Sequence, residues 1–159
     1  MQANFHLRPV RKALSNAAPR KTDVLILGAG AAGLMCAREA SAHGLDVALL
    51  ERAPSPGRKL CISGGGKANF TNRRLAAHHY ACADPAFCEP ALDAFTPQDM
   101  ERLVHGWGLP VEERAHGQLF LTVPAKRLLD ALVQDCRRQG CALHCQTDVH
   151  DVVPLPDGA

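Results

Sequence analysis

The hydrophobic positions near the start of the chain predict a strand, a helix and a second strand. Residues 23–27 form a continuous apolar run that stops at a glycine, as expected for a strand buried on both faces of a parallel sheet. Residues 31–43 are rich in helix-forming residues and end at Gly44, which can adopt a left-handed cap. Residues 46–50 repeat the buried-strand pattern. The fold class is therefore α/β, with two parallel strands joined by a right-handed crossover.

Farther along, the pattern predicts two more helices and two more strands. Thr96 and the residues after it resemble a helix start, and an apolar stripe predicts a helix at about 97–106. A second stripe with basic residues at its end predicts a helix over 125–139. Residues 142–146 and 149–153 are predicted as strands.

Three other segments carry signals of irregular structure or no signal. The proline- and glycine-rich stretch from 52 to 66 is predicted as loop. Residues 73–95 have no strong period and receive no assignment. The Pro156-Asp157-Gly158 sequence is a hairpin turn signal close to the end of the chain.

Composition and charge predict two regions. The 159 residues, 47% hydrophobic, suffice for one ordinary core. Residues 1–22 contain five basic residues and no acid, so we predict a disordered basic leader there, followed by one domain over 23–159. That domain has 13 basic and 16 acidic residues, a balance that gives no support to nucleic-acid binding.

Cysteine spacing and hydropathy exclude other classes. The seven cysteines lack the paired spacing of zinc sites, so we predict no metal, and Cys36, Cys136 and Cys141 are interpreted as small core residues. No apolar run approaches the roughly 20 residues of a membrane-spanning helix. We therefore expect a cytoplasmic protein without a membrane partner.

The segment between the first strand and the first helix carries the candidate chemistry. Gly28-Ala29-Gly30-Ala31-Ala32-Gly33 is a G-x-G-x-x-G sequence in the strand-to-helix context that dinucleotide binding requires. Gly28 can make the tight turn, Gly30 lets a pyrophosphate approach the backbone, and Gly33 lets helix and strand pack closely. The amides and dipole of the helix start, at Ala31 and Ala32, suit the phosphate charge.

An acid completes this predicted nucleotide site. Glu51 lies 23 residues after Gly28 at the end of the second strand, where a carboxylate can accept hydrogen bonds from ribose hydroxyls. It would repel a 2′-phosphate, which disfavours NADP and leaves NAD or FAD. The next good strand comes about ninety residues later, and an insertion of that length favours a flavoprotein and FAD.

Residues 23–72 resemble a bacterial family of flavoproteins, the aminoacetone-oxidase-like or BaiN-type NAD(P)/FAD-dependent oxidoreductases. The most specific part is the sequence GRKLCISGGGKANFTN over 57–72, which is similar to the family signature GRK-x-x-x-SGGG-R-C-N-x-TN. Weaker similarity continues to Val149. The resemblance implies a Rossmann-like FAD-binding domain, of which this chain is the N-terminal part.

The resemblance also implies which residues meet the cofactor. The glycine turn and Glu51 are expected to hold the ADP part of FAD, Arg52 is expected to be a cofactor-binding residue, and the backbone of Val149 is expected to meet the adenine. The residues expected near the pyrophosphate, ribitol or flavin are Arg58, Lys59, Ser63, Gly66, Asn69 and Thr71. Lys59 and Lys67 can equally be solvated loop charges.

The chain departs from the family in two respects. Lys67 and Ala68 stand where the family has Arg-Cys, so any role of that thiol beside the flavin would be absent. Family members are much longer, so we expect a truncated chain without the substrate domain. In this topology the first strand should be central, and loss of later strands would expose one of its edges and give marginal stability.

Three functions remain open from the sequence. The first is an FAD-dependent oxidoreductase with NAD(P)H as donor and an unknown small-molecule substrate. The second is a nucleotide-binding fragment without turnover, and the third is a plain NAD-binding module. No catalytic residue is assigned, because the isolated histidines His78, His79, His105 and His116 are interpreted as surface residues.

Overall fold

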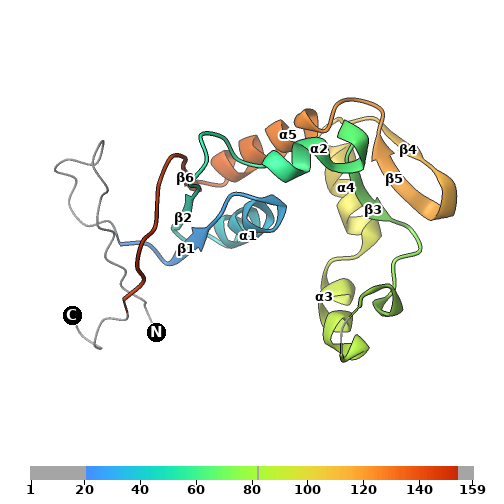
Figure 1. Cartoon of the computed structure of the whole chain (residues 1–159), viewed down its shortest axis with the longest axis horizontal. Helices are drawn as coiled ribbons and strands as arrows, with labels where there is room; N and C mark the ends of the chain where they lie inside the picture. The colour runs from blue at the N-terminus through green and yellow to red at the C-terminus, as the bar shows by residue number, and fades with distance from the viewer. Residues whose placement is uncertain (1–20, 82, 154–159) are drawn as a thin grey trace. The chain divides into compact units, whose positions relative to one another are not determined.

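The computed structural model describes residues 21–81 and 83–153, which form two compact units (Figure 1). Unit 1 consists of the chain up to Arg58 and from Leu132 onward, and unit 2 consists of Lys59–Ala131. The basic leader up to residue 20, Cys82 and the turn signal at 156–158 lie outside the described residues.

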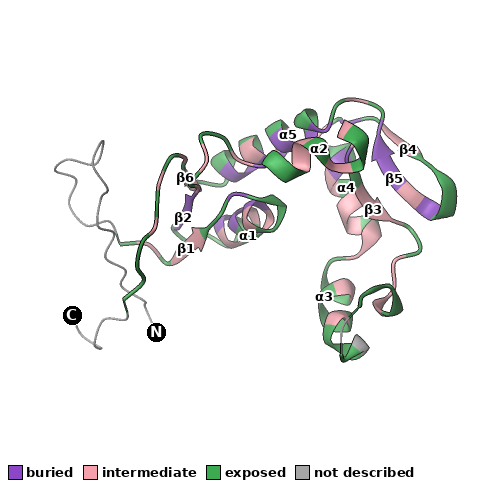
Figure 2. Ribbon diagram, in the orientation of Figure 1, coloured by how far each residue is buried: buried purple, intermediate pink, exposed green. Residues whose placement is uncertain are grey.

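Unit 1 contains the predicted parallel sheet, with strand order β1-β2-β6. The strands are β1 (Val24–Leu27), β2 (Val47–Leu50) and β6 (Ala142–His144). All four residues of β2 are buried between the two neighbouring strands, whereas Leu27 of β1 is 52% exposed (Figure 2). Within the described residues β1 pairs with β2 alone.

The predicted helices of unit 1 are confirmed. Helix α1 (Ala31–Ala42) follows β1 and packs on β1 and β2. It ends at His43, and Gly44 then takes a positive φ of 79°, as the cap prediction required. Helix α5 (Lys126–Arg138) runs into unit 1, where its buried Asp135 accepts a 2.7 Å hydrogen bond from Nε of Arg38. A buried carboxylate needs such a partner, so this ion pair fixes α5 against α1.

The cysteines of unit 1 differ from the prediction at one position. Cys136 and Cys141 are buried as expected, but Cys36 is exposed on α1. The prediction for Cys36 was wrong because cysteine identity does not reveal which face of a short helix meets the sheet. Cys136 donates a 3.2 Å hydrogen bond to the carbonyl oxygen of Leu34, and burial raises the pKa of its thiol to about 11.

This raised pKa makes the stability of unit 1 sensitive to alkaline pH. Above about pH 9 the thiol ionises in the unfolded chain but stays protonated in the native protein up to about pH 11. The native state then binds more protons, so stability falls as pH rises through this window. We expect the urea midpoint of the wild type to fall more between these pH values than that of Cys136→Ala. The exposed-site variant Cys36→Ala should behave like the wild type, and identical pH slopes in all three proteins would contradict this assignment.

Two other predictions near the sheet are corrected by the structure. Residues 149–153 are not a strand, because Gln146 takes a positive φ of 56° after β6 and Val152 and Val153 are 48% and 47% exposed. The stretch from 52 to 66 is not wholly loop, because α2 (Arg58–Gly66) begins inside it. The helical conformation ends at Ser63, where the glycines that suggested loop take over.

Unit 2 holds an antiparallel sheet that the hydrophobic pattern did not predict, with order β3-β5-β4. Its strands are β3 (Asn69–Asn72), β4 (Val111–Glu113) and β5 (Gln118–Leu121). The strands are three or four residues long, and the β3–β5 register shifts between Asn69 and Thr71. Such short, irregular strands give too few alternating positions to detect a period of two.

Helices complete unit 2. The predicted helix after Thr96 is confirmed as α4 (Pro97–Gly106), with Thr96 and Asp99 forming a reciprocal cap. The unassigned stretch contains three short helices, η1 (Ala77–His79), η2 (Pro85–Cys88) and α3 (Glu89–Ala94). A further single turn, η3 (Ala115–Gly117), joins β4 to β5.

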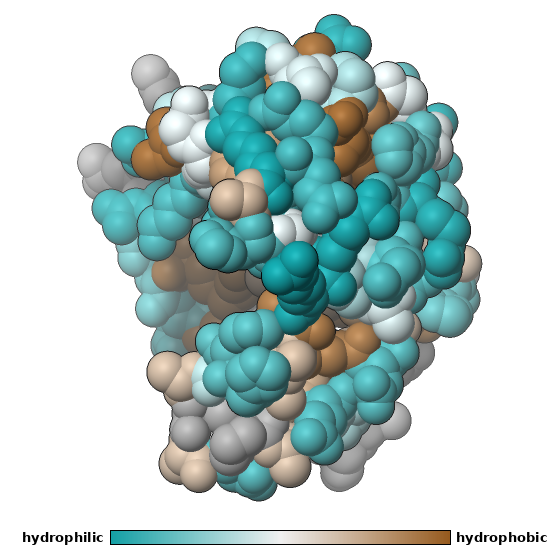
Figure 3. All heavy atoms as spheres, turned by 90° about the vertical axis from the view of Figure 1, so that its right-hand side faces the viewer, coloured by the Kyte–Doolittle hydropathy of each residue, from teal (hydrophilic) through white to brown (hydrophobic). Residues whose placement is uncertain are grey.

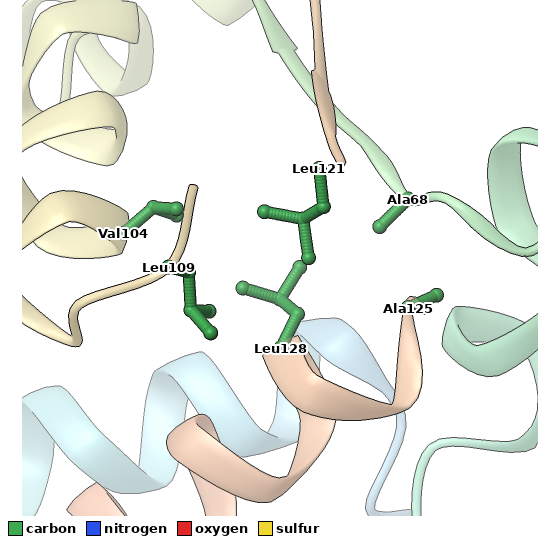
Figure 4. Packing of buried hydrophobic residues seen from close by; sticks show 6 residues of the cluster. All are labelled: Ala68, Val104, Leu109, Leu121, Ala125 and Leu128. Atoms are coloured by element: carbon green, nitrogen blue, oxygen red, sulfur yellow. The ribbon is translucent and has the colours of Figure 1, made fainter. Parts of the chain in front are cut away.

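The core of unit 2 brings together residues that are distant in the sequence. Figure 4 shows six buried side chains from β5, α4, α5 and the connecting segments pointing toward one another. They are Ala68, Val104, Leu109, Leu121, Ala125 and Leu128. Unit 2 therefore has its own hydrophobic core and forms the long insertion between β2 and β6.

The face drawn in Figure 3 carries mainly hydrophilic side chains, with smaller hydrophobic areas between them. No helix in residues 21–81 and 83–153 is long and apolar enough to cross a membrane. The same residues contain no group of three or more His, Cys, Asp or Glu side chains arranged to hold a metal ion.

Candidate functional site

The glycine turn lies at the junction of β1 and α1, as the sequence predicted. Gly28 has a positive φ of 98°, a conformation that costs little only for glycine, and its N–H donates a 2.7 Å hydrogen bond to the carbonyl oxygen of Leu50. Gly30 is exposed, and a Cβ added to it would meet no atom within 4 Å. Open space therefore borders the backbone at the position where a pyrophosphate has to approach.

Gly33 has a different and purely steric requirement. A Cβ at this position would lie 2.0 Å from the carbonyl oxygen of Gly28 and 3.4 Å from the side chain of Ile26. The first distance is far inside van der Waals contact, and the clashing atom belongs to the backbone. Only glycine allows α1 to begin this close to the end of β1.

The start of α1 is uncapped by side chains. Gly30 occupies the cap position without a side-chain hydrogen bond, and the first turn contains no acidic residue. Ala31 and Ala32 are exposed there. Because no residue of the first turn is acidic and no side chain caps it, the positive end of the helix dipole and the first amides of α1 suit an anionic ligand.

Glu51 lies at the carboxyl end of β2 and is bound to the glycine turn. Its Oε2 accepts a 2.8 Å hydrogen bond from the N–H of Ala29, and its Oε1 accepts another of 2.8 Å from the N–H of Ala53. An ionised carboxylate has about four acceptor positions, so two remain for ribose hydroxyls. The sequence predicted the acid but not its bonds to Ala29 and Ala53, since these depend on the turn being folded.

The segment that carries Val149 runs beside Glu51. The N–H of Thr147 donates to the carbonyl oxygen of Glu51 at 2.9 Å, and the N–H of Gln146 donates to that of Ala53 at 3.1 Å. Nε of Arg52 lies 3.3 Å from Oδ1 of Asp148 in an exposed ion pair. The structure therefore brings Arg52 and the Val149 segment to the same strand end as the acid.

A thiol also lies close to the acid. Burial raises the pKa of Cys145, and the neighbouring Glu51 carboxylate raises it further. This proximity could not be predicted from the sequence, because Cys145 follows a strand that is paired to β2 only in the folded sheet.

The residues predicted to lie near the pyrophosphate, ribitol or flavin belong to α2 and to unit 2. Arg58 and Lys59 are exposed at the start of α2, and Ser63 donates a 2.7 Å hydrogen bond from Oγ to the carbonyl oxygen of Leu60. Gly66 has a positive φ of 83° and is half-buried. Asn69 and Thr71 belong to β3, where they pair with β5.

The two positions that depart from the family signature have structural roles in unit 2. The Lys67 ammonium donates a 2.7 Å hydrogen bond to the carbonyl oxygen of Thr122. Ala68 has a positive φ of 48° and is fully buried in the core seen in Figure 4. A side chain at position 68 therefore points into a hydrophobic core.

The histidines have the exposed positions that the sequence indicated. All four side chains are exposed, and they lie on η1, α4 and η3. They are His78, His79, His105 and His116.

These residues fit the ADP part of a dinucleotide. Open backbone at Gly30, the uncapped start of α1 and the spare acceptor positions of Glu51 match a pyrophosphate and an adjacent ribose. The parallel sheet with this turn at its carboxyl end defines a dinucleotide-binding domain of the Rossmann type.

The family follows from comparison with known proteins. Residues 22–158 match the HI0933-like protein Rossmann domain, which covers nearly all of the chain. The chain belongs to this family, and its cofactor is FAD. The predicted resemblance, the α/β fold class and the choice of FAD are thus confirmed.

Two curated relatives share a name. Ribosomal RNA dihydrouridine synthase of Escherichia coli is 38% identical over 130 residues, which cover 82% of this chain and 32% of the relative. The protein of the same name from Haemophilus influenzae is 35% identical and matches 82% of this chain and 33% of its own length. The chain spans about a third of these relatives.

Solved structures agree with the fold. The crystal structure of Thermovibrio ammonificans THI4 matches with a TM-score of 0.51 and 17% identity, over 78% of this chain and 38% of that one. At this identity the likeness shows the fold alone.

Proposed function

We propose that this chain supplies the FAD-binding part of an NAD(P)H-linked flavoprotein reductase that acts on uridine in ribosomal RNA. The observation that carries the cofactor site is the Gly28–Gly33 turn with Glu51 bonded to it through Ala29. The observation that favours the substrate is the match of 82% of the chain to two ribosomal RNA dihydrouridine synthases.

The residues of unit 1 would bind and orient the cofactor. The amides at the start of α1 would hold the pyrophosphate, and Glu51 would accept hydrogen bonds from the adenosine ribose. Arg52 and the backbone near Val149 would border the adenine, while Arg58 and Lys59 would offer charge to anionic oxygens. Lys59, Ser63, Gly66, Asn69 and Thr71 are proposed to lie near the ribitol or flavin.

The proposed reaction suits this cofactor. Dihydrouridine differs from uridine by two hydrogens across one carbon–carbon double bond of the ring. When bound, FAD supplies the capacity to take a hydride from NAD(P)H and pass it to such a bond. This chain contributes no assigned general acid, so the residue that delivers the proton is left open.

The substrate proposal differs from the expectation of no nucleic-acid partner. That expectation rested on charge, and several basic side chains of unit 2 are indeed engaged with acids. Arg73 pairs with Glu101 and Glu113, and Arg114 pairs with Glu112. We therefore propose RNA as the substrate of the whole protein without assigning an RNA-binding surface to these residues. Cytoplasmic location and NAD(P)H as donor stay predictions.

The decisive experiment combines cofactor binding and turnover. The purified chain is titrated with FAD, followed by flavin absorbance, and then incubated with NAD(P)H and unmodified ribosomal RNA. We expect the chain to bind FAD, and we expect NAD(P)H oxidation that depends on FAD, with a gain of two hydrogens in one uridine by mass spectrometry, where the chain is part of the whole protein. Heat-denatured chain serves as the control.

Other outcomes favour the alternatives. FAD binding without NAD(P)H oxidation would favour a nucleotide-binding protein without turnover. Binding of NAD in place of FAD would favour a plain NAD-binding module. NAD(P)H oxidation that leaves the RNA unchanged would retain the reductase and remove the RNA substrate, in favour of a small molecule.

A further inference from the structure

The triple-glycine turn at the end of α2 has a non-helical backbone that is hydrogen-bonded to other segments. Gly64, Gly65 and Gly66 have positive φ values of 55°, 64° and 83°. The carbonyl oxygen of Gly66 accepts a 2.7 Å hydrogen bond from the N–H of Ala125, and that of Lys67 accepts one of 2.9 Å from the N–H of Leu121. Glycine adopts positive φ without steric cost but has many alternative conformations, so contacts with neighbouring segments select this one.

The ring of Phe120 imposes the conformation at the first glycine. A Cβ added to Gly64 would lie 2.8 Å from Cε1 of Phe120 and 2.6 Å from the backbone nitrogen of Asn69. Phe120 is 8% exposed and is paired with Asn69 in the β3–β5 ladder. The turn is therefore packed directly against the ring edge, with no space for a side chain between them.

The ring is itself fixed from outside by a charged side chain. The guanidinium carbon of Arg114 lies 4.0 Å from the centroid of the Phe120 ring, in a cation–π contact. Arg114 is oriented by Glu112, whose Oε1 accepts a 2.7 Å hydrogen bond from Arg114 Nε. Strand β4 and turn η3 thus restrain a ring that contacts the glycine turn.

Phe120 is a buried hydrophobic residue that also packs against the glycine turn. The hydrophobic cluster of unit 2, as found in the described residues, contains the neighbouring Leu121 but is formed without Phe120. Phe70 on the adjacent strand does pack against that cluster. Two phenylalanines of the same sheet therefore have different neighbours, one the core and the other the glycine turn.

We propose that Phe120, held by Arg114, is a positioning residue that fixes the Gly64–Gly66 turn for the bound cofactor. This inference rests on the proposed FAD site, to which the turn belongs. A rigid ring limits the turn to one backbone conformation. The amides of the turn then keep one arrangement toward the bound FAD. Replacing the Phe120 ring by a flexible side chain of similar volume should loosen the turn without leaving a cavity in the core.

The test replaces each ring by a flexible side chain of similar size. Methionine keeps the buried apolar volume but has neither a rigid plane nor a π face. We expect Phe120→Met to weaken FAD binding about tenfold and to alter the visible circular dichroism of the flavin at saturating FAD. Phe70→Met should lower the thermal midpoint and leave both cofactor readouts at wild-type values.

Two further variants keep the test decisive. Phe120→Tyr retains the ring and should restore the flavin spectrum. If Phe120→Met does not fold, Arg114→Gln removes the exposed guanidinium from the ring and should change the flavin circular dichroism in a folded protein. Wild-type cofactor readouts in a folded Phe120→Met, or in Arg114→Gln when it is the variant tested, would overturn the inference. Failure of the wild type to bind FAD would instead remove the proposed function.

Discussion

Gly33→Ala should abolish measurable FAD binding and destabilise the chain. The new Cβ would lie 2.0 Å from the carbonyl oxygen of Gly28, so either α1 or the turn has to move. Overpacking of this kind typically costs about 1–3 kcal/mol, and here the clash is with backbone, which has little freedom to adjust. The shift also displaces the amides that would receive the pyrophosphate. Calorimetric titration with FAD and urea unfolding measure the two effects.

Gly106→Ala is the matched control for this variant. Gly106 ends α4, and a Cβ there would meet no atom within 4 Å. Alanine is favoured over glycine in a helix by about 0.5–1 kcal/mol, so stability should rise slightly or stay unchanged. FAD affinity should equal that of the wild type. If Gly33→Ala bound FAD as well as Gly106→Ala, the close approach of α1 to the turn would not matter for the cofactor.

Glu51→Ala should weaken FAD binding by a factor of about ten to one hundred. The change removes the acceptor for the N–H groups of Ala29 and Ala53 and the group proposed to bind the ribose. Each hydrogen bond to a charged group contributes about 1.5–3 kcal/mol, which sets this range. Affinities for FAD and for ADP should fall together, because the ribose lies in the part that both ligands share. Titrations with both ligands measure this effect.

Asp130→Ala provides the comparison for loss of an acid. Asp130 is exposed on α5 and pairs with Lys126 at 2.7 Å. Exposed ion pairs of this spacing contribute about 0.3–0.5 kcal/mol to stability, so the variant should remain folded. Its affinity for FAD and for ADP should equal that of the wild type. A Glu51→Ala protein that lost affinity for FAD but kept that for ADP would show that the acid acts away from the adenosine ribose.

The sequence was sufficient to predict the part of the site whose structure follows from the local pattern of residues. The β1–α1–β2 unit follows from two buried-strand runs and a helix between them, and the roles of Gly28 and Gly33 follow from that context. Glu51 could be identified because the end of a strand fixes the direction in which its side chain can act. Its bonds to Ala29 and Ala53 could not, because they join residues through the folded turn.

Unit 2 was poorly predicted because its structure depends on contacts between distant segments. Strand β3 lies in a sequence dominated by glycine and polar residues, and it becomes a strand only by pairing with β5. The packing of Gly64 against Phe120 joins residues that have no sequence relationship. The glycines there were interpreted as a sign of loop, whereas Gly64 is packed against the ring beside it.

The error at residues 149–153 has a similar cause. Residues 149–153 were predicted as a strand, but a strand needs a partner, and within the described residues this segment has none. Gln146 instead turns the chain so that Gln146 and Thr147 bond to Ala53 and Glu51. The same deviation brings the Val149 segment to the nucleotide end of the sheet.

A crystal structure of the chain with FAD tests the central claim most directly. The account predicts the pyrophosphate at the start of α1, beside the backbone of Gly30, with a Glu51 oxygen within hydrogen-bond distance of a ribose hydroxyl. FAD bound elsewhere on the chain, or with its adenosine ribose away from Glu51, would contradict it.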